Sequence, residues 1–386
     1  MSSSLPSLLS KLIATPSVNP AHSDDPSISG EERMAKLFET LFHERGLSVE
    51  RLYPLGKDRP GVIGRTRPGS IQKTLLLEMH LDTVGVEGMT IDPFQAEIKD
   101  GKIYGRGSCD MKGAMAALFH ALTLERIQAL NERGVQLILL GAPDEETGLN
   151  GATALAAEGW GADAAIILEP TGCRPVIAHK GALWYDVHLR GRSGHGSQPQ
   201  SGVSTNAALA EFLPALFEIH KTLTEEYTHP LLGTSTLNLG KITGGHTYNI
   251  IPERTLLNLD RRVIPNEPVD RFLHRVNDKI REMIDAGSLV DGECRSICEN
   301  AAFATPEDCP LVNILQHSIH RVTGQEAPVS GTSWVSDASP LSQTCSQILV
   351  FGPGDIAQAH TDNEYIEIGP LETASAIFAD FLDHYT

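Results

Sequence analysis

The sequence predicts an α/β protein in which a mixed sheet flanked by helices is interrupted by a second, α+β domain. The apolar runs TLLLEMHLDTV, VQLILLGAPDEE and ADAAIILEPT each end in polar residues, which is typical of buried parallel strands. After Ala178 the pattern becomes alternating, as in half-exposed antiparallel strands, and from Cys309 the chain returns to a helix and the strand QILVFGPG. A chain of 386 residues with 41% hydrophobic content is long enough for two cores.

The first domain is expected to begin with two helices. Apolar residues recur at helical spacing from Leu5 to Leu12, and a second helix is expected near Glu31 to Arg45, after a polar, proline-containing loop. Strands then alternate with helices, and the segment from Gly113 to Leu130 predicts one helix packed on the sheet.

The inserted domain shows its own order of elements. ALWYDVHLRG predicts a strand, Ser204 to Thr222 a helix, TSTLNLGKITGG and RTLLNLDRRVI two strands, and Val269 to Ala286 a second helix. The order β-α-β-β-α-β is that of the split, ferredoxin-like unit. We therefore expect a first domain over 1–178 and 296–386 and an inserted domain over 179–295.

Charge and composition exclude several classes of partner. The formal charge of −18 argues against a nucleic-acid partner, because such proteins usually carry a basic stripe. The sequence has neither a basic leader followed by an apolar stretch nor an apolar window long enough for a membrane span. The six cysteines include no Cys-x-x-Cys pair. A cytoplasmic protein without a membrane partner is the expectation.

Metal-ligand residue types follow the predicted strands. His80, in MHLDTV, could bind a metal with Asp82 orienting it, although an ordinary core or surface histidine is the alternative. In GRGSCDMKG, Asp110 stands where a helix begins, so it is either a helix N-cap or a carboxylate bridging two metals.

The remaining candidates are acidic residues and one histidine. Glu145 and Glu146 are consecutive in the turn PDEETG and cannot point the same way, so one could bind metal while the other holds a water; a solvated acidic turn is the alternative. Glu169 follows an apolar run, where a charge needs a partner. With His360 in AHTDNEY, these residues suit two borderline-hard divalent cations.

In this order, the segments resemble the dinuclear zinc aminoacylase and carboxypeptidase family over nearly the whole chain. Within that family the likeness is greatest to acetylornithine deacetylase and succinyl-diaminopimelate desuccinylase, through GPGDIAQAHTDNEY, AHKG and TLNLGKITGG. The resemblance implies a zinc-peptidase-like sheet, and it implies that the inserted domain is a lid through which a homodimer forms.

The resemblance also implies roles for individual residues. His80 and Glu169 would bind one Zn²⁺, Glu146 and His360 the other, and Asp110 would bridge them through a cis bond to Met111. Co²⁺ or Mn²⁺ could substitute. Asp82 would support His80, and Glu145 would be the general base acting on a water between the zincs.

In the lid, the likeness gives three further residues. His195 in SGHGSQP would bind the reacting carbonyl, Asn249 in GGHTYNIIP would contact the substrate, and Arg262 in LDRRVIP would bind its carboxylate; a structural salt bridge is the alternative for Arg262.

The implied reaction is hydrolysis of the amide bond of an N-acyl amino acid or short peptide. Desuccinylase, broader aminoacylase or dipeptidase activity is the alternative, and a non-catalytic member of the family is the rival from another class. Two departures from the family pattern bear on specificity. Residues 203–205 separate Gly202 from Asn206, where the family usually has one residue, and Trp334 is inserted in the loop SGTSWVSDAS.

Overall fold

The computed structural model describes residues 4–386, which divide into two compact units. The first unit comprises residues 4–177, Thr305–Ser330 and Ser336–Thr386, and the second comprises Ala178–Ala304 and Gly331–Val335. The boundary expected at residue 295 falls inside a strand that runs to Asn300, and the second unit continues to Ala304 and takes in the segment that carries Trp334.

The first unit is built on a mixed sheet with the strand order β1-β2-β6-β3-β7-β15-β8. Its central strands β6, β3, β7 and β15 run parallel, which confirms the parallel strands predicted from the apolar runs. The strands are β1 (Ser48–Leu52), β2 (Gly61–Arg65), β3 (Lys73–His80), β6 (Val135–Ala142), β7 (Ala164–Ile167), β8 (Val176–His179) and β15 (Ile348–Val350). A separate small sheet has the order β16-β5-β4, from Tyr365–Glu367, Lys102–Tyr104 and Ile98–Lys99.

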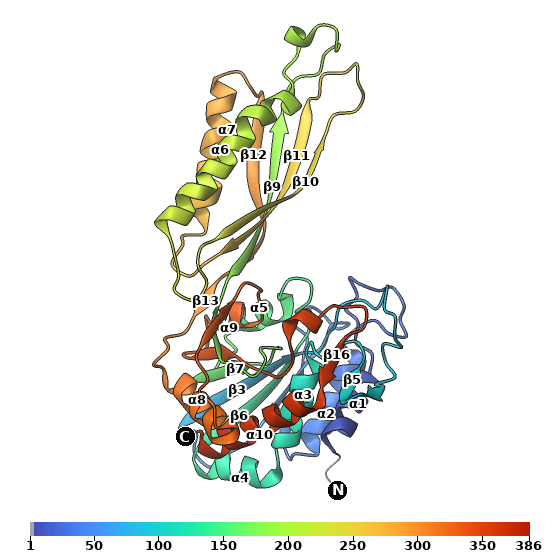
Figure 1. Ribbon diagram of the computed structural model, residues 1–386, viewed down its shortest axis with the longest axis vertical. Coiled ribbons are helices and arrows are strands. Elements are labelled where there is room, and N and C mark those ends of the chain that lie inside the picture. The colour runs from blue at the N-terminus through green and yellow to red at the C-terminus, as the bar shows by residue number, and fades with distance from the viewer. Residues whose placement is uncertain (1–3) are drawn as a thin grey trace. The chain divides into compact units, whose positions relative to one another are not determined.

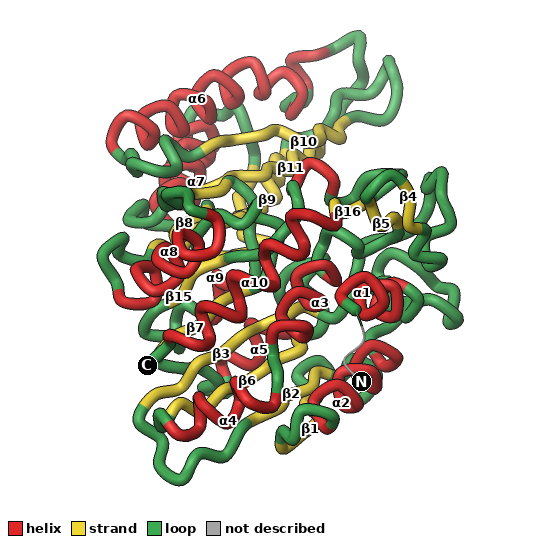
Figure 2. The backbone as a smooth tube through the Cα atoms, turned by 60° about the horizontal axis from the view of Figure 1, so that its bottom comes forward, coloured by secondary structure: helices red, strands yellow, loops and turns green. Residues whose placement is uncertain are grey.

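Helices cover both faces of the larger sheet. Figure 2 shows α3 and α10 side by side in front of the strands, flanked by α4 and α8, whereas α5 and α9 lie on the other face (Figure 1). The helices are α1 (Leu5–Ile13), α2 (Glu32–His43), α3 (Lys112–Ala121), α4 (Leu124–Glu132), α5 (Asn150–Ala157), α8 (Pro310–Thr323), α9 (Ala338–Leu341) and α10 (Ile368–His384), with a 3-10 turn at Ile356–Gln358. Within residues 4–386, no helix is both long and apolar enough to cross a membrane.

The single helix predicted from Gly113 to Leu130 is wrong in one respect, because the chain forms two helices there. Thr123 has an extended backbone conformation, and its side chain accepts a hydrogen bond from the Arg126 amide, so it caps α4 and separates it from α3. A threonine inside an apolar pattern does not break helical spacing, so periodicity alone could not reveal the interruption.

The second unit has the ferredoxin-like order of elements predicted from the sequence. Its sheet has the antiparallel order β10-β11-β9-β12, and α6 and α7 pack on one face of it (Figure 1). The elements are β9 (Gly181–Arg190), a 3-10 turn (Pro199–Ser201), α6 (Thr205–Glu226), β10 (Thr236–Gly244), β11 (Arg254–Val263), α7 (Asp270–Asp285), β12 (Asp291–Asn300) and β13 (Phe303–Ala304). The short strand β14 (Ser330–Thr332) pairs with β8.

A buried ion pair lies beneath α7 in this unit. Arg261 and Glu267 are both buried and form a salt bridge, and the Arg261 guanidinium also lies over the Phe272 ring at 4.8 Å. Two of the guanidinium nitrogens have no hydrogen-bond partner, so Glu267 supplies the main compensation for this buried charge.

Replacing Glu267 with Ala is expected to lower the free energy of unfolding by about 3–5 kcal/mol, because an uncompensated guanidinium would remain buried. Urea unfolding followed by circular dichroism measures this. The matched control is Asp278→Ala, which removes an exposed ion pair with Arg281 on α7 and should cost under about 1 kcal/mol. Equal losses in both variants would contradict the importance of the buried pair.

Candidate metal centre

The candidate site lies where the parallel strands of the first unit end. β3 ends at His80, which is paired in register with Ala142 at the end of β6. The turn after β6 carries Glu145 and Glu146, and Glu169 comes two residues after β7. Because parallel strands end at the same edge of a sheet, these side chains converge although they are distant in sequence.

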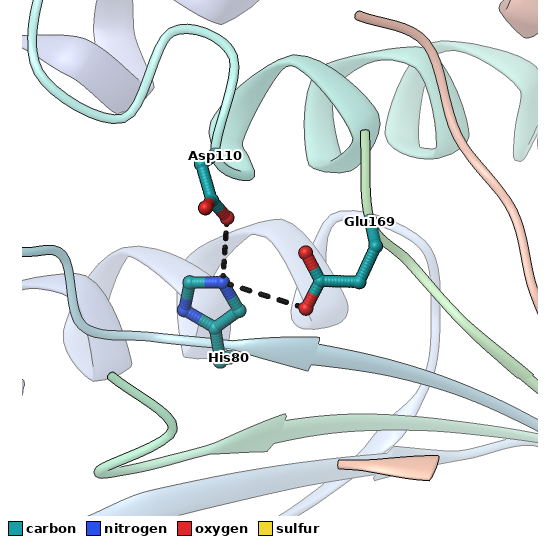
Figure 3. A group of neighbouring side chains, drawn as sticks. All are labelled: His80, Asp110 and Glu169. Atoms are coloured by element: carbon teal, nitrogen blue, oxygen red, sulfur yellow. Dashed lines mark hydrogen bonds and ion pairs between the residues drawn. The ribbon is translucent and has the colours of Figure 1, made fainter. Parts of the chain in front are cut away.

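The first group of side chains consists of His80, Asp110 and Glu169, all buried (Figure 3). His80 Nε2 lies 3.1 Å from Asp110 Oδ1 and 3.9 Å from Glu169 Oε1. Asp110 approaches from the start of α3, and its bond to Met111 is cis, as the resemblance implied.

The second group shares Asp110 and adds Glu146 and His360. His360 Nε2 lies 3.2 Å from Asp110 Oδ2 and 3.1 Å from Glu146 Oε2. One carboxylate oxygen of Asp110 therefore faces each histidine, which is the arrangement that a carboxylate bridging two cations requires.

The donor set fits two divalent cations. In each group one imidazole and two carboxylates have ligand atoms within 4.8 Å of one another. Four carboxyl groups, those of Asp110, Glu145, Glu146 and Glu169, crowd around two imidazoles, so burial and mutual repulsion disfavour the ionised forms of the glutamates unless cations are added. Mixed imidazole and carboxylate ligation suits Zn²⁺ and related ions.

The charges of the site act strongly on its ionisable groups. Burial opposes ionisation of Asp110, but hydrogen bonds from His360 and His80 outweigh it and lower the pKa of Asp110. The same contacts, with Asp110 and Glu146 as partners, raise the pKa of His360 to about 10. Burial works against the charged form of His80, yet Asp110 and Asp82 raise its pKa well above the usual value.

Asp82 holds the turn that carries the two glutamates. Its carboxylate accepts hydrogen bonds from the backbone amides of Glu145 and Glu146, at 3.1 and 3.2 Å. His80 Nδ1 lies 3.0 Å from the Asp82 carbonyl oxygen but 3.7 Å from its carboxylate. His80 Nδ1 therefore contacts the Asp82 carbonyl oxygen directly, while the nearby Asp82 carboxylate acts on the charge of the ring.

Glu145 belongs to neither ligand group. Burial raises the pKa of its carboxyl group well above the ordinary value; the charge of His80 opposes this shift, and those of Glu169 and Glu146 reinforce it. A carboxyl group with a raised pKa next to a metal centre is suited to accepting and returning protons.

Sequence reasoning missed the residues that support Asp82. The Asn19 side chain donates to both Asp82 and Asp144, at 2.7 and 2.8 Å. Arg59 in turn donates to Asp144 and Glu31. Asn19 is 63 positions from Asp82 in the chain, so no local pattern pointed to this network.

A pair of buried carboxyl groups was also missed. Glu78 and Asp337 are fully buried, and burial raises the pKa of Asp337 to about 7 and that of Glu78 well above its ordinary value. Glu78 lies in β3 between the apolar residues Leu77 and Met79, where an acidic residue was the available signal.

The other predicted residues, His195, Asn249 and Arg262, belong to the second unit. The first two lie together, because His195 forms an antiparallel bridge with Ile250 and the Gly196 amide donates to the Asn249 carbonyl at 2.8 Å. Both side chains are exposed. Arg262 is partly exposed and its Nε lies 3.0 Å from Asp260, so it makes the salt bridge that was the alternative reading of this residue.

A family model for peptidase family M20/M25/M40 matches residues 76–384. The chain belongs to this family. Its relatives include acetylornithine deacetylase of Photorhabdus laumondii, which is 32% identical and aligns over 98% of this chain and 96% of its own length. Acetylornithine deacetylase of Myxococcus xanthus is 30% identical over 88% of each chain.

Solved structures of peptidases share the fold. Aminopeptidase PepT from Bacillus cereus superimposes with a TM-score of 0.76 at 20% identity, over 98% of this chain and 97% of that one. The Bacillus subtilis protein YXEP, described as a dinuclear metal-binding peptidase of the M20 family, gives a TM-score of 0.71 at 14% identity, over 98% and 96%. With the deacetylase relatives, family membership identifies this chain as a metal-dependent hydrolytic enzyme of the M20 family.

Binding of Zn²⁺ to the metal-free protein at pH 7 is expected to release protons, because a ligating histidine must be neutral and a ligating carboxyl group ionised, and the metal-free site raises the pKa values of His80, His360 and Glu169. The pKa values of His80 and His360 are both raised, so both imidazoles carry a proton in the metal-free protein at this pH. The affinity for Zn²⁺ should therefore increase from pH 6 to pH 8. Calorimetry in buffers of different ionisation enthalpy counts the protons. Heat that does not depend on the buffer would contradict the expectation.

Proposed function

We propose that this enzyme hydrolyses the amide bond of an N-acyl amino acid, in the manner of an acetylornithine deacetylase, at a centre of two Zn²⁺ ions. The observation that carries the proposal is the pair of ligand groups that share Asp110, with Glu145 beside them and outside both. Similarity to acetylornithine deacetylases over nearly the full length supports the choice of substrate class.

Within this proposal, His80 and Glu169 would hold one ion, Glu146 and His360 would hold the other, and Asp110 would contribute to both positions. Ions held there would supply Lewis-acid activation of water and of the acyl carbonyl. Asp82 fixes His80 and the turn of Glu145 and Glu146, so that the ligands are in place before substrate binds.

Glu145 is proposed to carry the proton. It takes a proton from the attacking water and returns it to the leaving amine, so one carboxyl group serves as base and then as acid. His195 donates a hydrogen bond to the carbonyl oxygen as negative charge develops on it. Asn249 contacts the substrate, and Arg262 exchanges Asp260 for the substrate α-carboxylate.

The second unit is proposed to act as the lid and to pair two chains into a homodimer. The loops that carry His195 and Asn249 are joined by main-chain bonds and expose both side chains, so they could reach into the site of a second chain. A cytoplasmic location stays a prediction.

The substrate class is tested directly with Zn²⁺-loaded protein and four compounds: N-acetylornithine, N-succinyl-diaminopimelate, N-acetylmethionine and a dipeptide. We expect the largest kcat/KM for N-acetylornithine. A larger value for one of the other compounds would reassign the substrate within the same chemistry, and no turnover of any would contradict amide hydrolysis of this class.

Glu145→Gln should retain two metal ions yet lose about 10²–10⁴-fold in kcat, the range for removing a general base. Its neighbour provides the control, because Glu146→Gln alters a proposed ligand and should lower metal content. Metal analysis by mass spectrometry alongside kinetics separates the two outcomes. Loss of one metal equivalent from Glu145→Gln would make that residue a ligand instead.

Mixing His195→Ala and Glu145→Ala chains tests whether His195 acts on the partner's site. If it does, half of the randomly assorted dimers contain one intact site, and about a quarter of wild-type activity returns. A mixture of Glu145→Ala and Glu169→Ala chains is the control, because both lesions lie in the first unit and no intact site should form. No recovery in the His195 mixture would show that the histidine acts within its own chain.

A further inference from the structure

Glu364 is a fully buried carboxylate close to the metal centre, and the proposed function gives it no role. Its two oxygens accept hydrogen bonds from the backbone amides of Gly107, Cys109 and Asp110, at 3.0, 2.9 and 3.0 Å. The Arg106 guanidinium adds a fourth bond at 2.7 Å. Both carboxylate oxygens of Glu364 therefore already accept hydrogen bonds from protein groups, and the residue belongs to neither ligand group.

The donors all belong to the turn that presents Asp110. Gly107 has a φ of +81°, a conformation that side-chain-bearing residues rarely adopt, and the amides of the turn converge on one carboxylate. A concave set of backbone amides of this kind is an anion-binding nest. Here the anion is a side chain of the same protein.

Glu364 also ties this turn to the segment of the second histidine. It lies four residues after His360, and its own carbonyl oxygen accepts a hydrogen bond from the Gly105 amide at 3.0 Å. Glu364 therefore links the segment that carries the proposed ligand His360 to the turn that carries the shared ligand Asp110.

The energetics favour a fixed geometry. A buried carboxylate without partners costs several kcal/mol, whereas one with charge-assisted bonds to a guanidinium and to backbone amides is stabilised. Backbone amides cannot rotate away as side chains can, so the carboxylate and the turn constrain each other. Any shift of the Asp110 turn relative to Glu364 must break some of these bonds.

We propose that Glu364 is a positioning residue that sets the distance between Asp110 and His360 and thereby the affinity of both metal positions. The proposal rests on the dinuclear centre of the proposed function. Asp110 is common to both ligand groups, so displacing it should weaken both positions, whereas loss of Glu146 should weaken only one.

The test compares Glu364→Gln with Glu367→Gln. The glutamine at 364 has nearly the same shape but only one acceptor oxygen, and its NH₂ group would face donors, so the four bonds cannot all form. Glu367 is a matched control three residues along: its carboxylate is exposed and lies 4.0 Å from Lys102. Glu364→Asp, which keeps the charge on a shorter side chain, serves as a second variant if Glu364→Gln does not fold.

The measurements are Co²⁺ affinity by calorimetry, the visible absorption of the Co²⁺ protein, and thermal unfolding without metal. Affinity at both positions should fall about 10–100-fold in the Glu364 variant, with an altered Co²⁺ spectrum, as for other groups that orient ligands. Glu367→Gln should match wild type. A lower unfolding temperature with unchanged affinity and spectrum would mean a structural role only and would overturn the proposal.

A measurement on the wild-type protein needs no variant. The amides of Gly107, Cys109 and Asp110 should be protected from hydrogen exchange even without metal, because Glu364 already binds them. Unprotected exchange at these amides would also overturn the proposal. Failure of wild-type protein to bind two ions is a separate outcome, which would contradict the proposed function itself.

Discussion

The rest of the structure depends on the crowding of like charges around Asp110. Asp110, Glu145, Glu146 and Glu169 bring their carboxylates together at one edge of a sheet, with His80 and His360 as the available counter-charges. Such a group is unfavourable unless cations occupy it, so the fold must hold the residues in place while their own interactions would push them apart. This repulsion lowers the stability of the metal-free protein, and binding of cations would relieve it.

The fold meets this constraint with rigid strands and buried hydrogen bonds. The parallel strands β3, β7 and β6 fix the positions of His80, of Glu169 and of the turn with Glu145 and Glu146, which lie at their ends. Each of these strands is paired on both sides. The buried carboxylates of Asp82 and Glu364 then accept hydrogen bonds from backbone amides of the two turns that carry Glu146 and Asp110. In both cases a carboxylate that belongs to neither ligand group fixes the turn that carries a proposed ligand. This is favourable although both groups are acidic, because the contact is made by backbone amides, which carry partial positive charge.

In the second unit, the residues with proposed functions lie outside the core. Its core is one layer of helices on an antiparallel sheet, and its single fully buried arginine is compensated by a glutamate and an aromatic ring within the described residues. The residues with proposed functions lie on its exposed side and its loops, where they are free of the core. Burial positions the proposed ligands His80, Asp110 and Glu169, whereas exposure leaves His195 and Asn249 available to another surface.

The sequence by itself determined the parallel strands, the β-α-β-β-α-β order and which residues gather at the strand ends, because strand periodicity and strand ends are local properties. The tertiary structure alone decided the helix break at Thr123, the extent of the second unit beyond residue 295, and the pairing of Arg262 with Asp260. It also revealed the partners Asn19, Arg59 and Glu364. Glu364 is 254 positions from Asp110, and hydrogen bonds over such separations leave no periodic trace in the chain, because they depend on where whole elements pack.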